Sequence, residues 1–316
     1  MQTVKTIWGE VAKESLGFVD IHDHIWKKGG LEVREDRDFA IDNLEKSRSE
    51  LISFGKAGGG TIVDMQPIGV GRGIEAMREI AKDSGVNVIA VTGFHREAYY
   101  DNTHFVHKYE VDEIEDLLVK EVTEGIEVTD YCGPIIRRSQ AKAGLVKAGT
   151  SYYKITPLEM KMLRATSGAA VKADTPIITH TQMGTMGLEQ AQIIKSYGVL
   201  PERICIGHLD RDADPIYHAR VLNEGVYVQY DCIARAKYHP ILDTINLIKA
   251  MIEKGYENRI TIGGDWGRSS YLKAYGGGPG LEYLPRYFQF YMKEYGLSDE
   301  IIHKIFYENP ARFLAS

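Results

Sequence analysis

Four histidines and one aspartate are spaced along the chain so that their side chains could meet at metal ions. His22 and His24 belong to the segment FVDIHDHIW, which reads as the end of a strand. Residues i and i+2 of a strand face the same side, so both imidazoles can point to one place. Neutral imidazoles that converge in this way are typical ligands of zinc and related metals. The alternative is that both are ordinary histidines of a turn.

Three further candidates stand where later apolar runs end. His180 ends PIITH, His208 ends ICIGH, and Asp265 follows ITIGG. In an α/β barrel, the carboxyl ends of the strands line the active site. Any one of these residues could instead be a core residue or a helix cap, but their joint recurrence at run ends indicates a metal site.

Lys147 is the sixth candidate, because it lies within an apolar run, AGLVKAGT. An ammonium group that points into a cationic metal site would be repelled and desolvated, which lowers its pKa. The alternative is a lysine that extends to the surface, and Lys142 and Lys154 are rival candidates. Lys154 lies off the strand, just before a helix cap at Thr156, so Lys147 is favoured.

Eight short apolar runs alternate with helix-like segments along the chain. Continuous runs of valine and isoleucine are typical of strands buried on both faces, as in a parallel sheet. Eight βα units favour a closed (β/α)8 TIM barrel, an α/β fold, over an open doubly wound sheet. The predicted strands are Phe18 to His22, Thr61 to Met65, Asn87 to Thr92, Gly144 to Lys147, Ile177 to His180, Ile204 to His208, Val226 to Tyr230 and Ile260 to Gly264.

The rest of the chain fits one domain that spans residues 1–316. The N-terminal segment TVKTIWGEVAKES alternates and turns at Gly9, which predicts a short β-hairpin at the bottom of the barrel. ITPLEMKMLRAT begins with a capping box of Thr156 and Glu159, and Pro157 stands at the first helical position. The 316 residues are normal for one barrel with insertions, and no repeat or linker divides them.

The charge balance and the cysteines exclude several classes of protein. With 44 acidic and 38 basic residues, the chain gains nothing from attraction to a polyphosphate, which argues against nucleic acid as a partner. Three cysteines without a CxxC pair predict free thiols in the reducing cytoplasm. We expect no secretory signal at the N-terminus, and no apolar run is long enough to predict a membrane span.

These motifs together resemble the phosphotriesterase family of the amidohydrolase superfamily. The likeness includes HDH on the first strand, the strand lysine, the two strand-end histidines and GGDW. It extends to TGFHREAYY, THTQMGTMGLEQ, GHLDRD and ENPARFL, and so runs from about Gly9 to Phe313. The resemblance is greatest to the lactonases of the family, some of which act on phosphorylated sugar lactones.

The resemblance implies two divalent metal ions. By this likeness His22, His24 and Asp265 bind the more buried ion, and the two later histidines bind the more exposed one. Lys147, carbamylated to N6-carboxylysine, would bridge both ions together with a hydroxide that attacks the substrate, and Asp265 would then pass the proton to the leaving group. Asp210 is expected to orient neighbouring groups, or else to be a loop carboxylate. Zinc is the expected metal, although manganese, cobalt and iron suit the same ligands.

The loops after the seventh and eighth runs predict the charge of the substrate. These loops often bind phosphate in α/β barrels, and basic or phenolic side chains there suit a dianion. A neutral substrate would favour apolar loops, and the alternative is that the charges only decorate a solvated rim. After the third strand, His95, Arg96, Tyr99 and Tyr100 could line the pocket, or else be ordinary loop residues. The expected substrate contacts are His95, Tyr100, Arg235, Lys237, Arg268 and Tyr271.

The expected function is that of a binuclear lactonase acting on an anionic small molecule, a pentono-1,4-lactone 5-phosphate. One rival is a phosphotriesterase or generalist lactonase for neutral organophosphates or acyl-homoserine lactones. A second rival is a non-catalytic protein that binds metal or sugar phosphate, which the complete ligand set disfavours. Relatives in this family are often dimers, so a homodimer is compatible with the resemblance.

Overall fold

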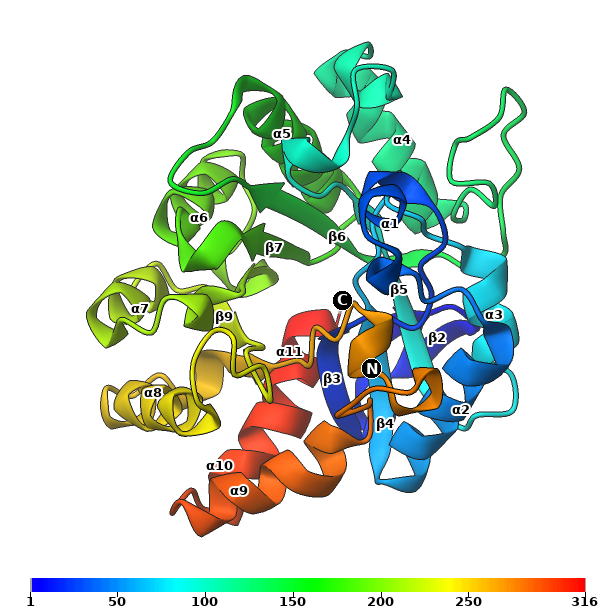
Figure 1. Cartoon of the computed structure of the whole chain (residues 1–316). Coiled ribbons are helices and arrows are strands. Elements are labelled where there is room, and N and C mark those ends of the chain that lie inside the picture. The colour runs from blue at the N-terminus through cyan, green and yellow to red at the C-terminus, as the bar shows by residue number, and fades with distance from the viewer. Residues whose placement is uncertain (1, 316) are drawn as a thin grey trace.

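Eight parallel strands form the central sheet of the computed structural model, which describes residues 2–315 (Figure 1). They follow one another around the sheet in chain order, and each overlaps one of the eight predicted runs. The (β/α)8 barrel prediction is therefore confirmed. The strands are β3 (Phe18–Asp23), β4 (Gly59–Asp64), β5 (Asn87–Gly93), β6 (Ala143–Thr150), β7 (Ile177–Thr181), β8 (Ile204–Gly207), β9 (Tyr227–Tyr230) and β10 (Ile260–Ile262).

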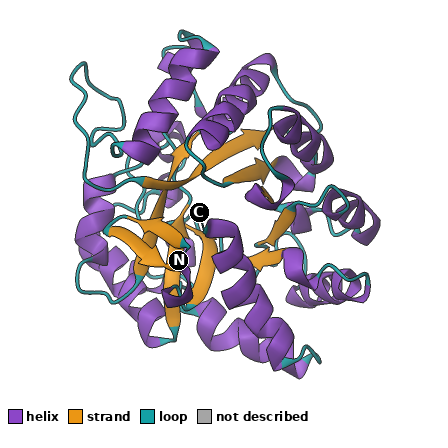
Figure 2. Cartoon of the chain, turned by 180° about the vertical axis from the view of Figure 1, so that it is seen from behind, coloured by secondary structure: helices purple, strands orange, loops and turns teal. Residues whose placement is uncertain are grey.

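Helices surround this ring of strands, as the view from behind in Figure 2 shows. The predicted capping box opens α5, where the Thr156 hydroxyl accepts from Glu159 N–H and the Glu159 carboxylate accepts from Thr156 N–H. No helix within residues 2–315 has the length and apolar character needed to cross a membrane. The helices are α1 (Gly30–Glu35), α2 (Leu44–Lys56), α3 (Ile74–Ala81), α4 (Val111–Thr123), α5 (Pro157–Lys172), α6 (Gly187–Ser196), α7 (Pro215–Leu222), α8 (Ile241–Glu253), α9 (Gln289–Glu294), α10 (Asp299–His303) and α11 (Asn309–Leu314).

The ring closes between β10 and β3 through the segment that follows β10. Asp265 N–H donates to the His22 carbonyl oxygen at 2.8 Å. The N–H groups on either side of Asp265 donate to two buried carboxylates of β3, Asp20 at 3.2 Å and Asp23 at 3.1 Å. The same carboxylates accept from the backbone N–H groups of His22 and His24. This seam therefore holds three of the predicted metal ligands in a fixed relation to one another.

The opposite end of the barrel is closed by apolar side chains. The hairpin of β1 (Thr3–Thr6) and β2 (Gly9–Ala12) contributes Val4 to a buried cluster inside the barrel. Phe313 of α11 joins the same cluster, and both chain ends lie near the centre of Figure 2. The predicted N-terminal hairpin at the bottom of the barrel is thus confirmed.

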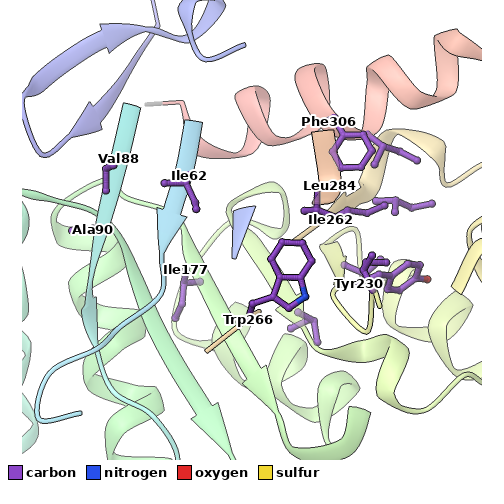
Figure 3. Packing of buried hydrophobic residues seen from close by; sticks show 14 of the residues in the cluster. Ile62, Val88, Ala90, Ile177, Tyr230, Ile262, Trp266, Leu284 and Phe306 are labelled. Atoms are coloured by element: carbon purple, nitrogen blue, oxygen red, sulfur yellow. The ribbon is translucent and has the colours of Figure 1, made fainter. Parts of the chain in front are cut away.

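A larger apolar core lies between the strands and the surrounding helices. Figure 3 shows part of it, with Trp266 from the segment after β10 beside Ile262 and Leu284. Trp266 is fully buried, so it anchors the segment that carries Asp265. The core thereby connects barrel packing to the position of a predicted catalytic residue.

Candidate metal centre and active site

The structure brings the six predicted metal-ligand residues together at the carboxyl ends of the strands. The Nε2 atoms of His22 and His24 lie 3.5 Å and 3.4 Å from Asp265 Oδ1. The imidazole centroid of His208 lies 4.8 Å from that of His22 and 4.5 Å from that of His180. Lys147 of β6 lines the same cavity. Side chains from five different strands or strand ends therefore face one space.

Unusual backbone conformations aim two of these residues inward. His208 has a φ of +60° and Asp265 a φ of +48°, in the left-handed region that residues with a side chain rarely adopt. Strain of this kind persists only where the surroundings enforce it, and it concentrates at functional sites. Next to Asp265, a Cβ at Gly263 would lie 2.7 Å from His22 Cβ, so only glycine permits this approach.

The histidines of the site are buried and neutral. Burial is the main cause that lowers the pKa of His24 to about 4, and it holds those of His22, His180 and His208 well below the usual value. Among the described atoms, His22 Nε2, His24 Nδ1 and His180 Nδ1 are buried without a hydrogen-bond partner. Buried polar atoms in native proteins are nearly always paired, so these nitrogens indicate a missing ligand.

Lys147 is buried, whereas its rivals Lys142 and Lys154 are exposed. Its Nζ donates to the Met65 carbonyl oxygen at 2.7 Å. Burial lowers the pKa of Lys147 to about 8. A substantial fraction of the amine is therefore neutral near physiological pH, which is the form that can react with carbon dioxide.

The donor set fits divalent transition metals. Ligand atoms of His22, His24 and Asp265 lie within 4.8 Å of one another. Neutral imidazole and carboxylate are the ligands that zinc, manganese and cobalt share. Burial would raise the pKa of Asp265, but the positive charge of the Arg235 guanidinium is the largest opposing cause and holds that pKa well below its usual value. The carboxylate is therefore ionised, as a metal ligand must be.

Partners behind the ligands orient the imidazole rings. Asp231 Oδ2 lies 2.6 Å from His208 Nδ1, and Gln229 Oε1 lies 3.1 Å from His22 Nδ1. Such contacts are typical of metal-binding histidines, because they fix the tautomer and the ring plane. Asp210, the orienting residue expected from the sequence, accepts from the N–H of Asp231 at 3.0 Å and so supports it from behind.

The sequence interpretation missed Asp231, Gln229 and Arg211. Asp231 directly follows β9 and could have been found by the same strand-end rule that selected the other ligands. Arg211 Nη2 lies 2.6 Å from Asp265 Oδ2, a contact that no spacing in the sequence indicates. Arg235 was expected to bind substrate, but its guanidinium pairs with Asp265 and Asp231 at 2.7 Å each. Its donors are thus directed at the protein's own carboxylates.

A cavity opens above the ligands. Five of the six residues expected to contact substrate line it, namely His95, Arg235, Lys237, Arg268 and Tyr271. Tyr100 is not among the lining residues. Its hydroxyl accepts from His95 N–H at 2.7 Å and donates to the Ile68 carbonyl oxygen at 3.1 Å, so it supports the loop from below.

Tyr99, the residue before Tyr100, takes the place in the cavity instead. Its ring centroid lies 3.7 Å from that of the His95 imidazole. The 3-10 turn Glu97–Tyr99 ends at this residue and turns the two tyrosines to opposite sides. Of the two tyrosines that could line the pocket, Tyr99 therefore does so and Tyr100 does not.

The cationic rim, which we define as Lys237, Arg268 and Tyr271, lies in the loops after β9 and β10. Arg268 is neutralised in part, because Nη1 lies 2.7 Å from Asp36 Oδ2 and 3.2 Å from Asp38 Oδ2. Lys237 is exposed and has no carboxylate within ion-pair distance among residues 2–315. Lys237 is therefore the rim cation most available to an anion.

A (β/α)8 barrel with imidazole and carboxylate donors at the carboxyl ends of its strands is an architecture of metal-dependent hydrolases. The family model that matches residues 2–314 is that of the phosphotriesterase family, and the chain belongs to this family. A relative from Mycoplasmopsis synoviae, named phospho-furanose lactonase, is 39% identical over 98% of this chain and 91% of its own length.

Two solved structures are similar over nearly the whole chain. An amidohydrolase from Mycoplasma synoviae superposes with a TM-score of 0.96 and 38% identity, over 99% of this chain and 92% of that chain. A lactonase from Listeria monocytogenes superposes with a TM-score of 0.92 and 33% identity, over 99% of this chain and 98% of that chain. Both likenesses cover the strand ends that carry the donor set.

Proposed function

We propose that the protein is a metal-dependent lactonase that hydrolyses a phosphorylated furanose lactone. The observation that carries the proposal is a cavity with the metal-donor set at its floor and the cationic rim at its edge. A lactone carbonyl at the floor and a phosphate at the rim would occupy both at once. The name of the Mycoplasmopsis synoviae relative supports the same substrate class.

The residues that would hold two divalent ions are the six at the strand ends, namely His22, His24, Lys147, His180, His208 and Asp265. Zinc is the metal we propose, and manganese or cobalt suits the same donors. Lys147 would take part as a carbamate, because a neutral lysine offers only one weak donor whereas a carbamate offers two oxygens. When bound, the ions supply activated water and polarise the substrate carbonyl.

Asp265 is the residue we propose to move protons. Its carboxylate lines the cavity and is ionised, so it can accept a proton from the attacking water. As the new carbon–oxygen bond forms and the ring carbon–oxygen bond breaks, that proton passes to the departing ring oxygen. Arg211 and Arg235 hold the carboxylate in place from two sides during these transfers.

The phosphate would be bound by Lys237 and by the hydroxyl of Tyr271, with Arg268 as a weaker contributor. Basic side chains outnumber acidic ones in the lining of the cavity, a setting that suits an anion better than a neutral organophosphate or acyl-homoserine lactone. A neutral substrate would leave Lys237 without a partner. We therefore place the phosphorylated lactone ahead of the neutral alternatives.

Proton release by metal-loaded protein tests the proposal. The panel contains pentono-1,4-lactones with and without a 5-phosphate, an acyl-homoserine lactone and paraoxon. We expect strong turnover only with the phosphorylated lactones. Preference for the neutral lactone or for paraoxon would contradict the proposed substrate, and no turnover of any compound would contradict the proposed reaction.

A further inference from the structure

One carboxylate in the cavity is not explained by the metal site. Of the described residues that line the cavity, Glu32 and Asp265 are the acidic ones, and Glu32 belongs to α1 instead of a strand end. An acidic group works against phosphate binding, since like charges repel. Because basic residues outnumber acidic ones in this cavity, we look for a contribution of Glu32 to substrate binding other than phosphate binding.

The Glu32 carboxylate is held by two neighbours. Lys27 Nζ lies 3.0 Å from Oε2, and the Tyr99 hydroxyl donates to Oε1 at 3.2 Å. The side chains of Lys27 and Glu32 expose only 4% and 10% of their surfaces. Lys27 Nζ also donates to the Gly267 carbonyl oxygen at 3.1 Å. The pair is thus buried in the wall of the cavity and fixed on both sides.

Glu32 lines the same cavity as the metal-donor set. Tyr99, which donates to it, also lies against His95, and His95 lies 4.3 Å from His180 between ring centroids. Two rings, those of Tyr99 and His95, therefore connect Glu32 to the metal-donor set. The rim residue Arg268 lines the same cavity. A lactone with its carbonyl at the floor and its phosphate at the rim would pass Glu32 along its ring.

Backbone contacts hold the start of α1, the helix that carries Glu32, against the segment around Val70 and Gly71. Lys28 N–H donates to the Gly71 carbonyl oxygen at 2.9 Å. A Cβ at Gly30 would lie 3.0 Å from the Val70 carbonyl carbon, and one at Gly71 would lie 2.7 Å from the Gly29 carbonyl oxygen. These close backbone approaches fix the position of α1 independently of a ligand. A rigid acceptor of this kind loses little conformational entropy when a ligand binds.

We propose that Glu32, positioned by Lys27 and Tyr99, binds the ring hydroxyls of the lactone and selects hydroxylated substrates. The inference rests on the proposed function. An ionised carboxylate only accepts hydrogen bonds, and it has room for about four, of which the protein supplies two. Ring hydroxyls are the donors that a sugar lactone adds and that a lactone with an unsubstituted ring lacks.

The chemistry predicts discrimination against deoxy substrates. A ligand without hydroxyls would cover Glu32 and remove water from it without returning a donor, which is costly for a charged group. Sites that bind a substrate hydroxyl in this way reject analogues that lack it far more strongly than apolar pockets reject a missing methylene. From the strength of hydrogen bonds to charged groups, we expect a preference of about 10- to 100-fold in kcat/KM.

The experiment compares ribono-1,4-lactone 5-phosphate with its 2,3-dideoxy analogue in the metal-loaded enzyme. Both carry the phosphate and the same scissile bond, so their kcat/KM ratio isolates the hydroxyls. We expect the ratio to fall from about 10- to 100-fold in the wild type to near unity in Glu32→Leu. Glu32→Gln, which keeps an acceptor without the charge, is expected to lie between them.

Two further variants keep the test decisive. Glu35→Gln changes an exposed carboxylate of the same helix and should leave the ratio at its wild-type value. Because Glu32→Leu leaves buried Lys27 without its partner, the double variant Lys27→Met/Glu32→Leu serves if the single one does not fold. A wild-type ratio in Glu32→Leu or in Lys27→Met/Glu32→Leu would overturn the role of Glu32 and leave the proposed function standing. No turnover of either lactone by the wild type would overturn the proposed function and this inference with it.

Discussion

The floor and the rim of the cavity are built in different ways. At the floor, His22 and His208 are buried and Asp265 is half-buried at the strand ends. Each is held by a second side chain or by a backbone bond across the barrel. At the rim, Lys237 and Arg268 extend from loops and differ in whether a carboxylate already pairs with them. Residue type and strand position therefore suffice to predict the residues at the floor. At the rim, the charge that each cation offers to a substrate depends on whether a carboxylate already pairs with it.

This difference separates what the two regions control. Changes at the floor should affect metal binding and the chemical step for every substrate, since all substrates share that step. Changes at the rim should affect only substrates that carry a phosphate.

Replacement Asp265→Asn should have the largest effect. The amide cannot accept the proton and is a poor metal ligand, so we expect kcat to fall by roughly 10³-fold for phosphorylated and neutral lactones alike. Steady-state kinetics on both substrates measure this, with circular dichroism to confirm the fold. A loss of kcat confined to the phosphorylated lactone would contradict the view that floor residues act on every substrate.

Replacement Asp231→Asn should weaken metal binding without removing a ligand. His208 would lose the carboxylate that fixes its ring, and such losses cost about 10- to 100-fold in metal affinity. Competition with a chromophoric chelator measures the affinity. Asp243→Asn, a change to an exposed carboxylate on α8, serves as the control and should leave the affinity unchanged. Equal metal affinities of the two variants would show that Asp231 does not contribute to metal binding.

Replacement Lys237→Ala should raise KM for the phosphorylated lactone by about 10-fold, because an unpaired cation contributes a charge-assisted hydrogen bond to the phosphate. kcat, and all kinetics with the neutral lactone, should change little. Lys254→Ala, at another exposed lysine, is the matched control. A similar rise in KM for the neutral lactone would show that Lys237 shapes the cavity instead of binding the anion.

Replacement Arg268→Ala should have the smallest effect of the set. Its guanidinium already pairs with Asp36 and Asp38 and lies 3.7 Å from the Phe39 ring centroid, so it offers less to a phosphate. We expect KM for the phosphorylated lactone to rise by only about threefold, the size of a typical exposed ion pair. A rise larger than that of Lys237→Ala would show that the phosphate displaces the two aspartates.

The sequence predicted the floor well because strand ends have a fixed geometry. Eight apolar runs placed the strands, and the carboxyl ends of parallel strands converge at one face of a barrel. All six candidates from His22 to Asp265 accordingly lie together. Asp231 satisfies the same rule, and it was missed because its role is to orient His208 instead of contacting the expected ions.

The rim and walls were less predictable because loops determine them. Tyr100 and Tyr99 are neighbours, and only the turn at Glu97–Tyr99 decides which ring enters the cavity. Arg235 was placed in the correct loop, but its pairing with Asp265 joins residues from two different loops. Glu32 lies in the long connection between β3 and β4, where no pattern in the sequence indicates contact with the cavity.

Metal titration tests directly whether lactone hydrolysis depends on two metal ions at the proposed site. Protein stripped by a chelator is titrated with Zn²⁺ while bound metal and hydrolysis of the phosphorylated lactone are followed together. The account predicts negligible turnover without metal and full turnover at about two ions per chain, with both signals reduced in Asp265→Asn. Full turnover by the stripped protein, or saturation of metal binding without any turnover, would contradict it.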